Sequence, residues 1–222
     1  FMPYVSKILH TGRPLVYVDC FAGKGKFDDG NPGSPLIALE AIDKCQNITC
    51  TKFSQIEATF IDLNYADDLR KNLQKYPWVN VVAGKYEDNL ANILQGKEHC
   101  NVFLYIDPYG IKALKFSIFD DLSKKNFNSI ELLINMNSFG FIREACHALG
   151  TSFNDNTLFD DLIEYDPSKM NKSSESIDEL TAIAGGNYWR NIIDQYKAGA
   201  IDGYEAEMRF AEQYCQRLRQ NY

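Results

Sequence analysis

The residue types best suited to chemistry stand where short apolar runs of this sequence end. Asp19 lies near the end of the first run, Leu15–Phe21, and is followed by Gly23 and Gly25 in the pattern D-x-F-x-G-x-G. Glycines at such a turn let the backbone approach a ligand closely and tolerate positive φ angles. Because a carboxylate beside them repels phosphate, the pattern favours a ligand that carries a positive charge or hydroxyl groups.

Two common phosphate-binding motifs do not fit this turn. The dinucleotide pattern G-x-G-x-x-G needs a third glycine where Asp28 stands, and no G-x-x-x-x-G-K-[ST] can be written through Lys24 or Lys26. The turn therefore suits the amino-acid part of S-adenosylmethionine better than a pyrophosphate, and Phe21 belongs to the same expected site. A tight turn without a ligand remains the alternative.

The second apolar run ends at Asp62, with Asn64 just beyond it. In nucleotide-binding α/β folds an acid at this point accepts hydrogen bonds from ribose hydroxyls. Asp62 lies 37 residues after Gly25, against roughly 20 in the usual unit. Loops at 27–33 and 46–55 account for the surplus, so we expect Asp62 and Asn64 in the cofactor site.

Glu87 and Asp88 follow the third apolar run. Their carboxylates can accept a hydrogen bond from the amino group of adenine, and we include both in the expected cofactor site. The alternative places them in the first turn of a helix, where the helix dipole favours acidic residues.

The fourth apolar run ends in Asp107-Pro108-Tyr109-Gly110, the most specific motif of the chain. Proline fixes the turn and removes a backbone donor. A carboxylate and an outward carbonyl then accept the hydrogens of an exocyclic amine and orient its lone pair toward an electrophilic methyl group. Tyr109 can stack on a flat base, a contact worth about 1–3 kcal/mol. The alternative is a helix-capping turn with a core tyrosine.

The sequence offers little for metal or nucleophilic chemistry. Its six cysteines form no C-x-x-C pair and its three histidines form no ligand motif, so no metal is expected. A hydrolase with Cys20 or Ser34 as nucleophile is a weak alternative, since Cys20 has no adjacent histidine and Ser34, followed by Pro35, is placed to cap a helix.

Five apolar runs alternate with helix-like stretches, which predicts a parallel sheet covered on both faces. Ligands then bind at the carboxyl ends of the strands, beside the residues described above. The expected strands are 15–21, 57–63, 79–83, 101–107 and 130–136, and the expected helices between and after them are 34–45, 66–76, 88–95, 116–125 and 139–149.

The chain beyond Thr151 has a different character. A polar linker at 167–176 is followed by helical patterns at 177–184, 189–196 and 204–219, so we divide the chain into an α/β domain, 1–150, and a helical appendage, 151–222. The net charge of −7 is uneven: the first part has 17 acidic and 16 basic residues, the second 13 and 7. This balance argues against a nonspecific nucleic-acid binder.

Four segments, DCFAGKGKFDDGNPGSPLIAL, FIDLN, LYIDPYG and GGNYW, together resemble the three-Cys-motif partner protein family. These bacterial proteins are related to class I S-adenosylmethionine-dependent methyltransferases. The resemblance implies a three-layer α/β sandwich with a mostly parallel, Rossmann-like sheet. It also implies that Asp19, Gly23, Gly25 and Asp62 bind S-adenosylmethionine, and that Asp107, Pro108 and Tyr109 face the substrate.

The Asp-Pro-aromatic-Gly turn also resembles the fourth motif of tRNA guanine-N2 methyltransferases. It departs from the [DNS]-P-P-[YFW] motif of amino methyltransferases, because Tyr109 stands where that motif has its second proline. The expected function is methyl transfer to an exocyclic amine of a nucleobase in nucleic acid, with Trp189 as a further stacking candidate. The alternative is a non-catalytic, methyltransferase-like binding subunit of the three-Cys-motif partner protein.

Further expectations concern the setting of the protein. The family opens with a helix before the first strand and closes with a two-stranded hairpin, whereas this sequence runs from Phe1 to Tyr222, so we expect a chain truncated at both ends. No apolar run approaches about 18 residues and no signal-peptide pattern is present, so we expect a cytoplasmic protein with reduced thiols and no membrane contact.

Overall fold

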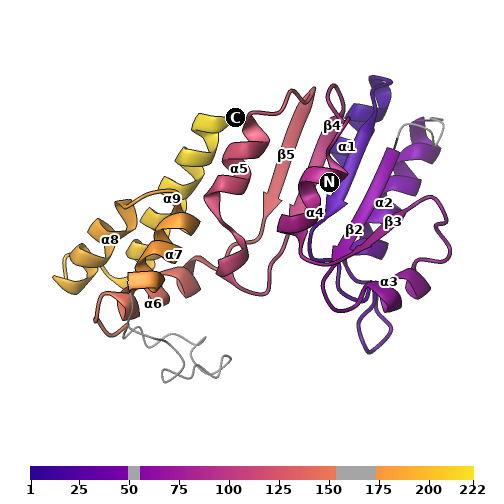
Figure 1. The fold of residues 1–222 in the computed structure, drawn as a ribbon. Helices are drawn as coiled ribbons and strands as arrows, with labels where there is room; N and C mark the ends of the chain where they lie inside the picture. Colours follow the sequence, from indigo (N-terminus) through magenta and orange to yellow (C-terminus); the bar gives the residue numbers. More distant parts are fainter. Residues whose placement is uncertain (50–55, 154–173) are drawn as a thin grey trace. The chain divides into compact units, whose positions relative to one another are not determined.

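The computed structural model describes residues 1–49, 56–153 and 174–222 (Figure 1). These residues divide into two compact units. The first unit comprises Phe1–Pro108 and Lys125–Asn135, and the second comprises Tyr109–Lys124 and Met136–Tyr222. Each unit is described below by itself.

The first unit is built on one five-stranded sheet in which every pair of neighbouring strands is parallel. The strand order is β3-β2-β1-β4-β5, so strands are added on one side of β1 up to β3 and on its other side from β4, and the topological switch point lies between β1 and β4. Asp19, the last residue of β1, is level with Phe60 on one side and with Tyr105 on the other. The strands are β1 (Leu15–Asp19), β2 (Ile56–Asp62), β3 (Asn80–Ala83), β4 (Asn101–Ile106) and β5 (Ser129–Ile134). The five predicted strands are thus confirmed, with small differences at their ends.

Burial explains why these runs form strands. All five residues of β1 are buried, as expected for a central strand with both faces covered. One face carries Tyr17, Ala58 and Phe60, which pack with helices α1 (Met2–His10), α2 (Ser34–Thr49) and α3 (Ala66–Asn72). Side chains alternate along a strand, so the side chains of Glu57 and Thr59 lie on the opposite face, where α4 (Tyr86–Ile93) packs against β2.

Helix α1 is the one element of the first unit that the sequence analysis did not predict. Pro3 occupies its first turn, and its buried residues Val5, Ile8 and Leu9 follow the helical spacing. These three side chains join the same core as α2 and β1. The signal was therefore present in the sequence, but unlike the helices that were predicted in this unit, this one does not follow an apolar run.

The second unit contains a 3-10 turn (Ile111–Ala113) and five helices: α5 (Phe116–Ser123), α6 (Ser138–Ala148), α7 (Ser174–Ala184), α8 (Tyr188–Lys197) and α9 (Gly203–Asn221). Its core is aromatic. Phe141 of α6 stacks on Phe210 of α9 with ring centroids 4.0 Å apart, and Trp189 of α8 meets Phe141 edge-on at 6.1 Å. This packing joins α6 to the C-terminal helices, whereas the sequence analysis placed the boundary at residue 150.

Trp189 is completely buried in this core, so it is not available to stack on a substrate. The rest of the GGNYW motif also has a structural role. Gly185 has a φ angle of +67°, and a Cβ there would overlap the ring of Phe116. The Arg217 guanidinium donates to the Gly185 carbonyl at 2.7 Å and lies 4.7 Å from the centre of the Tyr188 ring.

The structure can be compared with two further expectations, one about membrane-spanning helices and one about the polar linker. Within the part of the chain that the structure describes, no helix is long and apolar enough to cross a membrane. Most of the linker predicted at 167–176 lies outside the described residues.

Candidate functional site

A cleft of about 510 Å³ opens at the carboxyl end of the sheet, within the first unit. Its walls come from the turn after β1, the start of α2, the residues after β2 and the end of β4. This is the edge at which parallel α/β sheets bind ligands. The lining residues are Phe21, Ala22, Gly23, Lys24, Gly25, Lys26, Phe27, Asp28, Gly33, Ser34, Ile37, Tyr65, Tyr105 and Asp107.

Asp19 lies behind this cleft and is completely buried. Its Oδ1 accepts the backbone N–H of Phe21 at 3.1 Å, and its Oδ2 accepts the Ser34 hydroxyl at 2.8 Å. Burial raises the pKa of the Asp19 carboxyl to about 7, against the lowering effect of these two bonds, and the charges of Asp107 and Asp62 raise it further. Ser34 thus ties the start of α2 to the end of β1.

Asp62 is the second carboxylate at this edge of the sheet, and its hydrogen-bond partners are backbone N–H groups. Its Oδ2 accepts the N–H of Gly23 at 2.8 Å, while its Oδ1 accepts the N–H groups of Asn64 and Tyr65 at 2.8 and 2.7 Å. The carboxylate therefore fixes the glycine turn after β1 against the turn after β2.

The glycine turn has the backbone geometry that the sequence predicted. Gly23 and Gly25 have φ angles of +60° and +78°. A Cβ at Gly25 would lie 2.9 Å from Cδ1 of Leu69, whereas a Cβ at Gly23 would meet no atom within 4 Å. The absence of a side chain at Gly25 therefore lets the turn pack closely on Leu69 of α3. At Gly23 it leaves open space where the backbone borders the cleft.

Asp107, just after β4, lines the cleft with a half-buried side chain. Its Oδ2 accepts the Tyr105 hydroxyl at 2.9 Å, and its Oδ1 accepts Nδ2 of Asn135 at 2.8 Å. Burial raises the pKa of Tyr105 to about 12, and the Asp107 carboxylate adds to this shift, so the tyrosine remains a donor at neutral pH. These two donors orient the carboxylate.

The structure brings some of the sequence-predicted residues together and leaves others apart. Phe21, Gly23, Gly25 and Asp107 line the cleft, and Asp19 and Asp62 are hydrogen-bonded to its walls. Asp19 and Asp62 do not themselves line the cleft, and three more predicted cofactor residues lie outside the lining without such bonds to lining residues: Asn64, Glu87 and Asp88.

Glu87 and Asp88 are exposed in the first turn of α4, the placement that the alternative interpretation gave them. Pro108 is half-buried, and Tyr109 is fully exposed as the first residue of the second unit.

Several residues of the site were not singled out as such in the sequence. Tyr105 and Asn135 lie inside or just after apolar runs, where their types gave no signal. Phe27, Ile37 and Tyr65 are exposed at the cleft, Ile37 in the first turns of α2 and the other two in loops, and only their apolar or aromatic character marks them.

Among the charged residues of the cleft, Lys24 already has partners. Its Nζ lies 2.8 Å from Oδ1 of Asp28 and 5.3 Å from the centre of the Tyr65 ring. Three carboxyl groups lie in or beside the cleft walls: Asp107 lines the cleft, and Asp19 and Asp62 are hydrogen-bonded to lining residues. Their ionised forms favour a ligand that carries a positive charge nearby.

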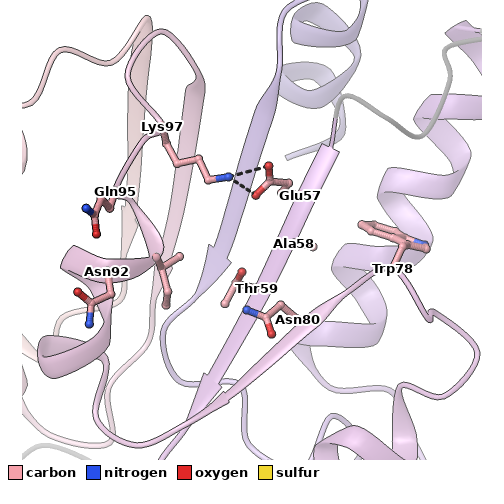
Figure 2. A pocket seen from close by; sticks show the side chains of 9 residues that line it. Glu57, Ala58, Thr59, Trp78, Asn80, Asn92, Gln95 and Lys97 are labelled. Carbon is pink, nitrogen blue, oxygen red and sulfur yellow. Dashed lines mark hydrogen bonds and ion pairs between the residues drawn. The ribbon is translucent and has the colours of Figure 1, made fainter.

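A second, smaller cavity of about 340 Å³ lies between α4 and the strands β2 and β3 (Figure 2). Lys97 donates to both carboxylate oxygens of Glu57, at 2.7 and 2.6 Å, so these two charges neutralise each other. Thr59 and Asn80 point toward one another from the strands, while Asn92 and Gln95 lie on the side of α4 (Figure 2). These neutral polar groups lie away from the carboxyl ends of the strands.

Comparison with known proteins adds nothing to this geometry. No protein-family model, no curated protein and no solved structure matches the chain. Among the described residues, no group of three or more histidine, cysteine, aspartate or glutamate side chains has the arrangement of a metal site.

Proposed function

We propose that this protein is an S-adenosylmethionine-dependent methyltransferase that acts on an exocyclic amine of a nucleobase in nucleic acid. The observation that carries the proposal is the convergence of three carboxylates, from Asp19, Asp62 and Asp107, around a glycine turn at the carboxyl ends of β1, β2 and β4. S-adenosylmethionine carries a sulfonium and an ammonium group, and both are stabilised by nearby carboxylates.

The residues of the cleft fit the amino-acid part of this cofactor. Gly23 leaves the space that a Cβ would fill, so the ligand can approach its backbone. Asp19 is buried behind the cleft wall with its pKa raised to about 7, and a positive charge of the ligand nearby would favour its ionised form. When bound, S-adenosylmethionine supplies an electrophilic methyl group.

In the proposed reaction the protein contributes orientation rather than a nucleophile. The Asp107 carboxylate accepts a hydrogen bond from the substrate amine, and the donors Tyr105 and Asn135 fix the direction of that carboxylate. The amine lone pair is then aligned for in-line displacement. Such positioning can contribute effective molarities of about 10⁵–10⁸ M, so no catalytic triad is required.

One observation favours a second candidate function. Asp62 accepts three backbone N–H groups, and the two on Oδ1 occupy both lone pairs of that oxygen. Ribose hydroxyls must therefore share Oδ2 with Gly23 or displace a bond within the turn. This favours a non-catalytic, methyltransferase-like subunit that binds a protein partner, which by resemblance is the three-Cys-motif partner protein.

The experiment that tests the proposal is transfer of tritiated methyl groups from S-adenosylmethionine to total tRNA, rRNA and DNA of the source organism. Wild-type protein is expected to label at least one of the three. The Asp107→Ala variant is expected to lose a factor on the order of 10²–10³ in kcat, by analogy with the loss of other oriented catalytic contacts. Cofactor affinity should stay almost unchanged, because Asp107 contacts the substrate.

The matched control is Asp67→Ala, which removes an exposed carboxylate of α3 that pairs with Arg70 at 2.7 Å. An exposed pair of this kind contributes little to stability, so activity should remain at the wild-type level. Labelling by Asp107→Ala at the wild-type rate would show that Asp107 has no catalytic role. If S-adenosylmethionine binds but labels none of the three nucleic acids, the non-catalytic alternative is favoured.

A further inference from the structure

The loop between β1 and α2 forms a small hairpin, residues 25–33, which we call the Phe27 hairpin. At its base the N–H of Gly33 donates to the carbonyl of Gly25 at 3.0 Å. Nearer the tip, the N–H of Phe27 donates to the carbonyl of Asn31 at 2.9 Å, and the N–H of Gly30 donates back to the carbonyl of Phe27 at 2.9 Å. The sequence predicts that this loop and a second one at 46–55 lengthen the spacing between the glycine turn and Asp62. Residues 46–49 belong instead to α2, and residues 50–55 lie outside the described residues.

The conformation of the hairpin is fixed by its own contacts. A Cβ at Gly33 would lie 3.2 Å from the carbonyl carbon and oxygen of Gly25, so the two strands of the hairpin approach closely at its base. Asp29 accepts the backbone N–H and Nδ2 of Asn31 at 3.0 and 2.8 Å. The hairpin therefore presents its side chains in a preset geometry, which reduces the entropy lost when a ligand binds.

This preset hairpin presents an aromatic side chain to solvent. Phe27 is 64% exposed, and it lines the same cleft as Ile37 and Tyr65, which are 56% and 43% exposed. Single exposed apolar residues are common, but a group of large ones around a cleft marks a binding site. These three side chains have no role in the contacts proposed above for the methyl donor or for Asp107.

We propose that the Phe27 hairpin binds the methyl acceptor, and that the ring of Phe27 stacks on a planar nucleobase at the mouth of the cleft. This inference rests on the proposed function and names the element that binds its substrate. The cleft lining combines large apolar side chains with the polar groups of Asp107 and Tyr105. A flat ring with a hydrogen-bonding edge matches both features, whereas a lipid chain would use only the apolar side chains.

One cation at the base of the hairpin can serve a nucleotide as the occupant. Lys24 is paired with Asp28, and Asp29 keeps its negative charge while it accepts hydrogen bonds from the neutral Asn31. Lys26 is exposed at the base of the hairpin and lines the cleft. Its ammonium group can interact with the phosphate of the stacked nucleotide.

Fluorescence of a Phe27→Trp variant tests this proposal directly. Stacking of a base on the introduced indole would quench its emission, so the variant is titrated with each of the four ribonucleoside monophosphates and with ribose 5-phosphate, which lacks a base. The titrations are run with and without saturating S-adenosylhomocysteine. We expect saturable quenching by at least one nucleotide in both conditions, and none by ribose 5-phosphate. The wild-type protein, with Trp78 and Trp189 alone, gives the background.

A second measurement compares binding of the best nucleotide to wild type, Phe27→Ala and Ile48→Ala by calorimetry. Ile48 is 70% exposed on α2 and does not line the cleft, so its substitution removes a similar apolar surface elsewhere. Phe27→Ala is expected to bind about 5- to 150-fold more weakly, the range for loss of one stacked base. Ile48→Ala should bind as wild type does.

Absence of quenching by all four nucleotides, equal quenching by ribose 5-phosphate, or equal affinity of Phe27→Ala and wild type would overturn the inference. Failure of the proposed function is detected separately, by titration of wild type with S-adenosylhomocysteine. If that ligand does not bind, the methyltransferase proposal fails, while the quenching measured without it still decides whether the hairpin binds a base.

Discussion

Asp19 illustrates how burial changes the role of a single side chain. The sequence marks it as an acid beside a glycine turn, and the structure places it, completely buried, in contact with Ser34 and the Phe21 backbone. Its raised pKa, about 7, means that the folded protein binds a proton that the unfolded chain has already lost at the same pH. Stability contributed by this group is therefore present below a pH of about 4 and is lost as the pH rises through about 7.

Replacing Asp19 with asparagine should remove this pH dependence. The amide oxygen of the introduced side chain can still accept the Phe21 N–H, and its NH₂ group can donate to the Ser34 hydroxyl. The free energy of unfolding of wild type, relative to Asp19→Asn, is expected to fall by up to about 4 kcal/mol between pH 4 and pH 8, from a shift of about three pH units. Urea unfolding of both proteins at several pH values measures this difference, and parallel pH profiles would contradict it.

Residue types alone located most of this site, but not its hydrogen bonds. The sequence indicated Asp19, Asp62 and Asp107 because each follows an apolar run. It could not indicate that Asp62 binds backbone N–H groups, or that Tyr105 and Asn135 orient Asp107, because those bonds depend on the register of neighbouring strands.

At the scale of elements, the turn between α7 and α8 shows how a motif can be structural. Gly185 and Gly186 separate the helices predicted at 177–184 and 189–196, and the sequence suggested the nearby Trp189 as a stacking candidate. In the structure Gly185 lies against the Phe116 ring and accepts a bond from Arg217, and Trp189 is part of the core. The pattern was correctly recognised as a helix break, whereas its role depended on contacts from distant parts of the sequence.

A pair of glycine substitutions separates backbone strain from steric overlap at this turn. Gly185 and Gly199 have similar φ angles, +67° and +69°, but a Cβ at Gly199 would meet no atom within 4 Å. Gly199→Ala should cost about 1–2 kcal/mol from backbone strain alone. Gly185→Ala should cost about 1–3 kcal/mol more, because the methyl group overlaps the Phe116 ring. Equal losses in the free energy of unfolding would show that the ring moves aside at no cost.

At the scale of the whole molecule, the sequence predicted the parallel sheet and all but one of the helices described. The apolar runs are long enough to identify central strands, and turn residues separate them from the helices. The helical residues 139–149 were assigned to the first domain because they follow the fifth strand directly. Phe141 instead packs with Phe210, a contact between residues far apart in the sequence, which local periodicity does not show.

The net charge of −7 also belongs to this scale. Protein–DNA affinity rises with the number of phosphates neutralised by lysine and arginine, and this chain has fewer of these residues than acids. Recognition of a nucleic acid would then depend on the local chemistry of the cleft and of the Phe27 hairpin, or on a partner protein that supplies positive charge.

The measurement that tests the central claim most directly is calorimetric titration of the whole protein with S-adenosylmethionine. The account predicts saturable binding at one site. It also predicts that Asp62→Ala weakens this binding by about 1.5–3 kcal/mol, the range for a charged acceptor, because the carboxylate fixes the glycine turn and its Oδ2 can accept a second hydrogen bond from a ribose hydroxyl. Asp67→Ala, on the surface of α3, should bind as wild type does. Saturable binding with equal affinity in all three proteins would remove Asp62 from the site, and no binding by wild type would contradict the methyltransferase proposal itself.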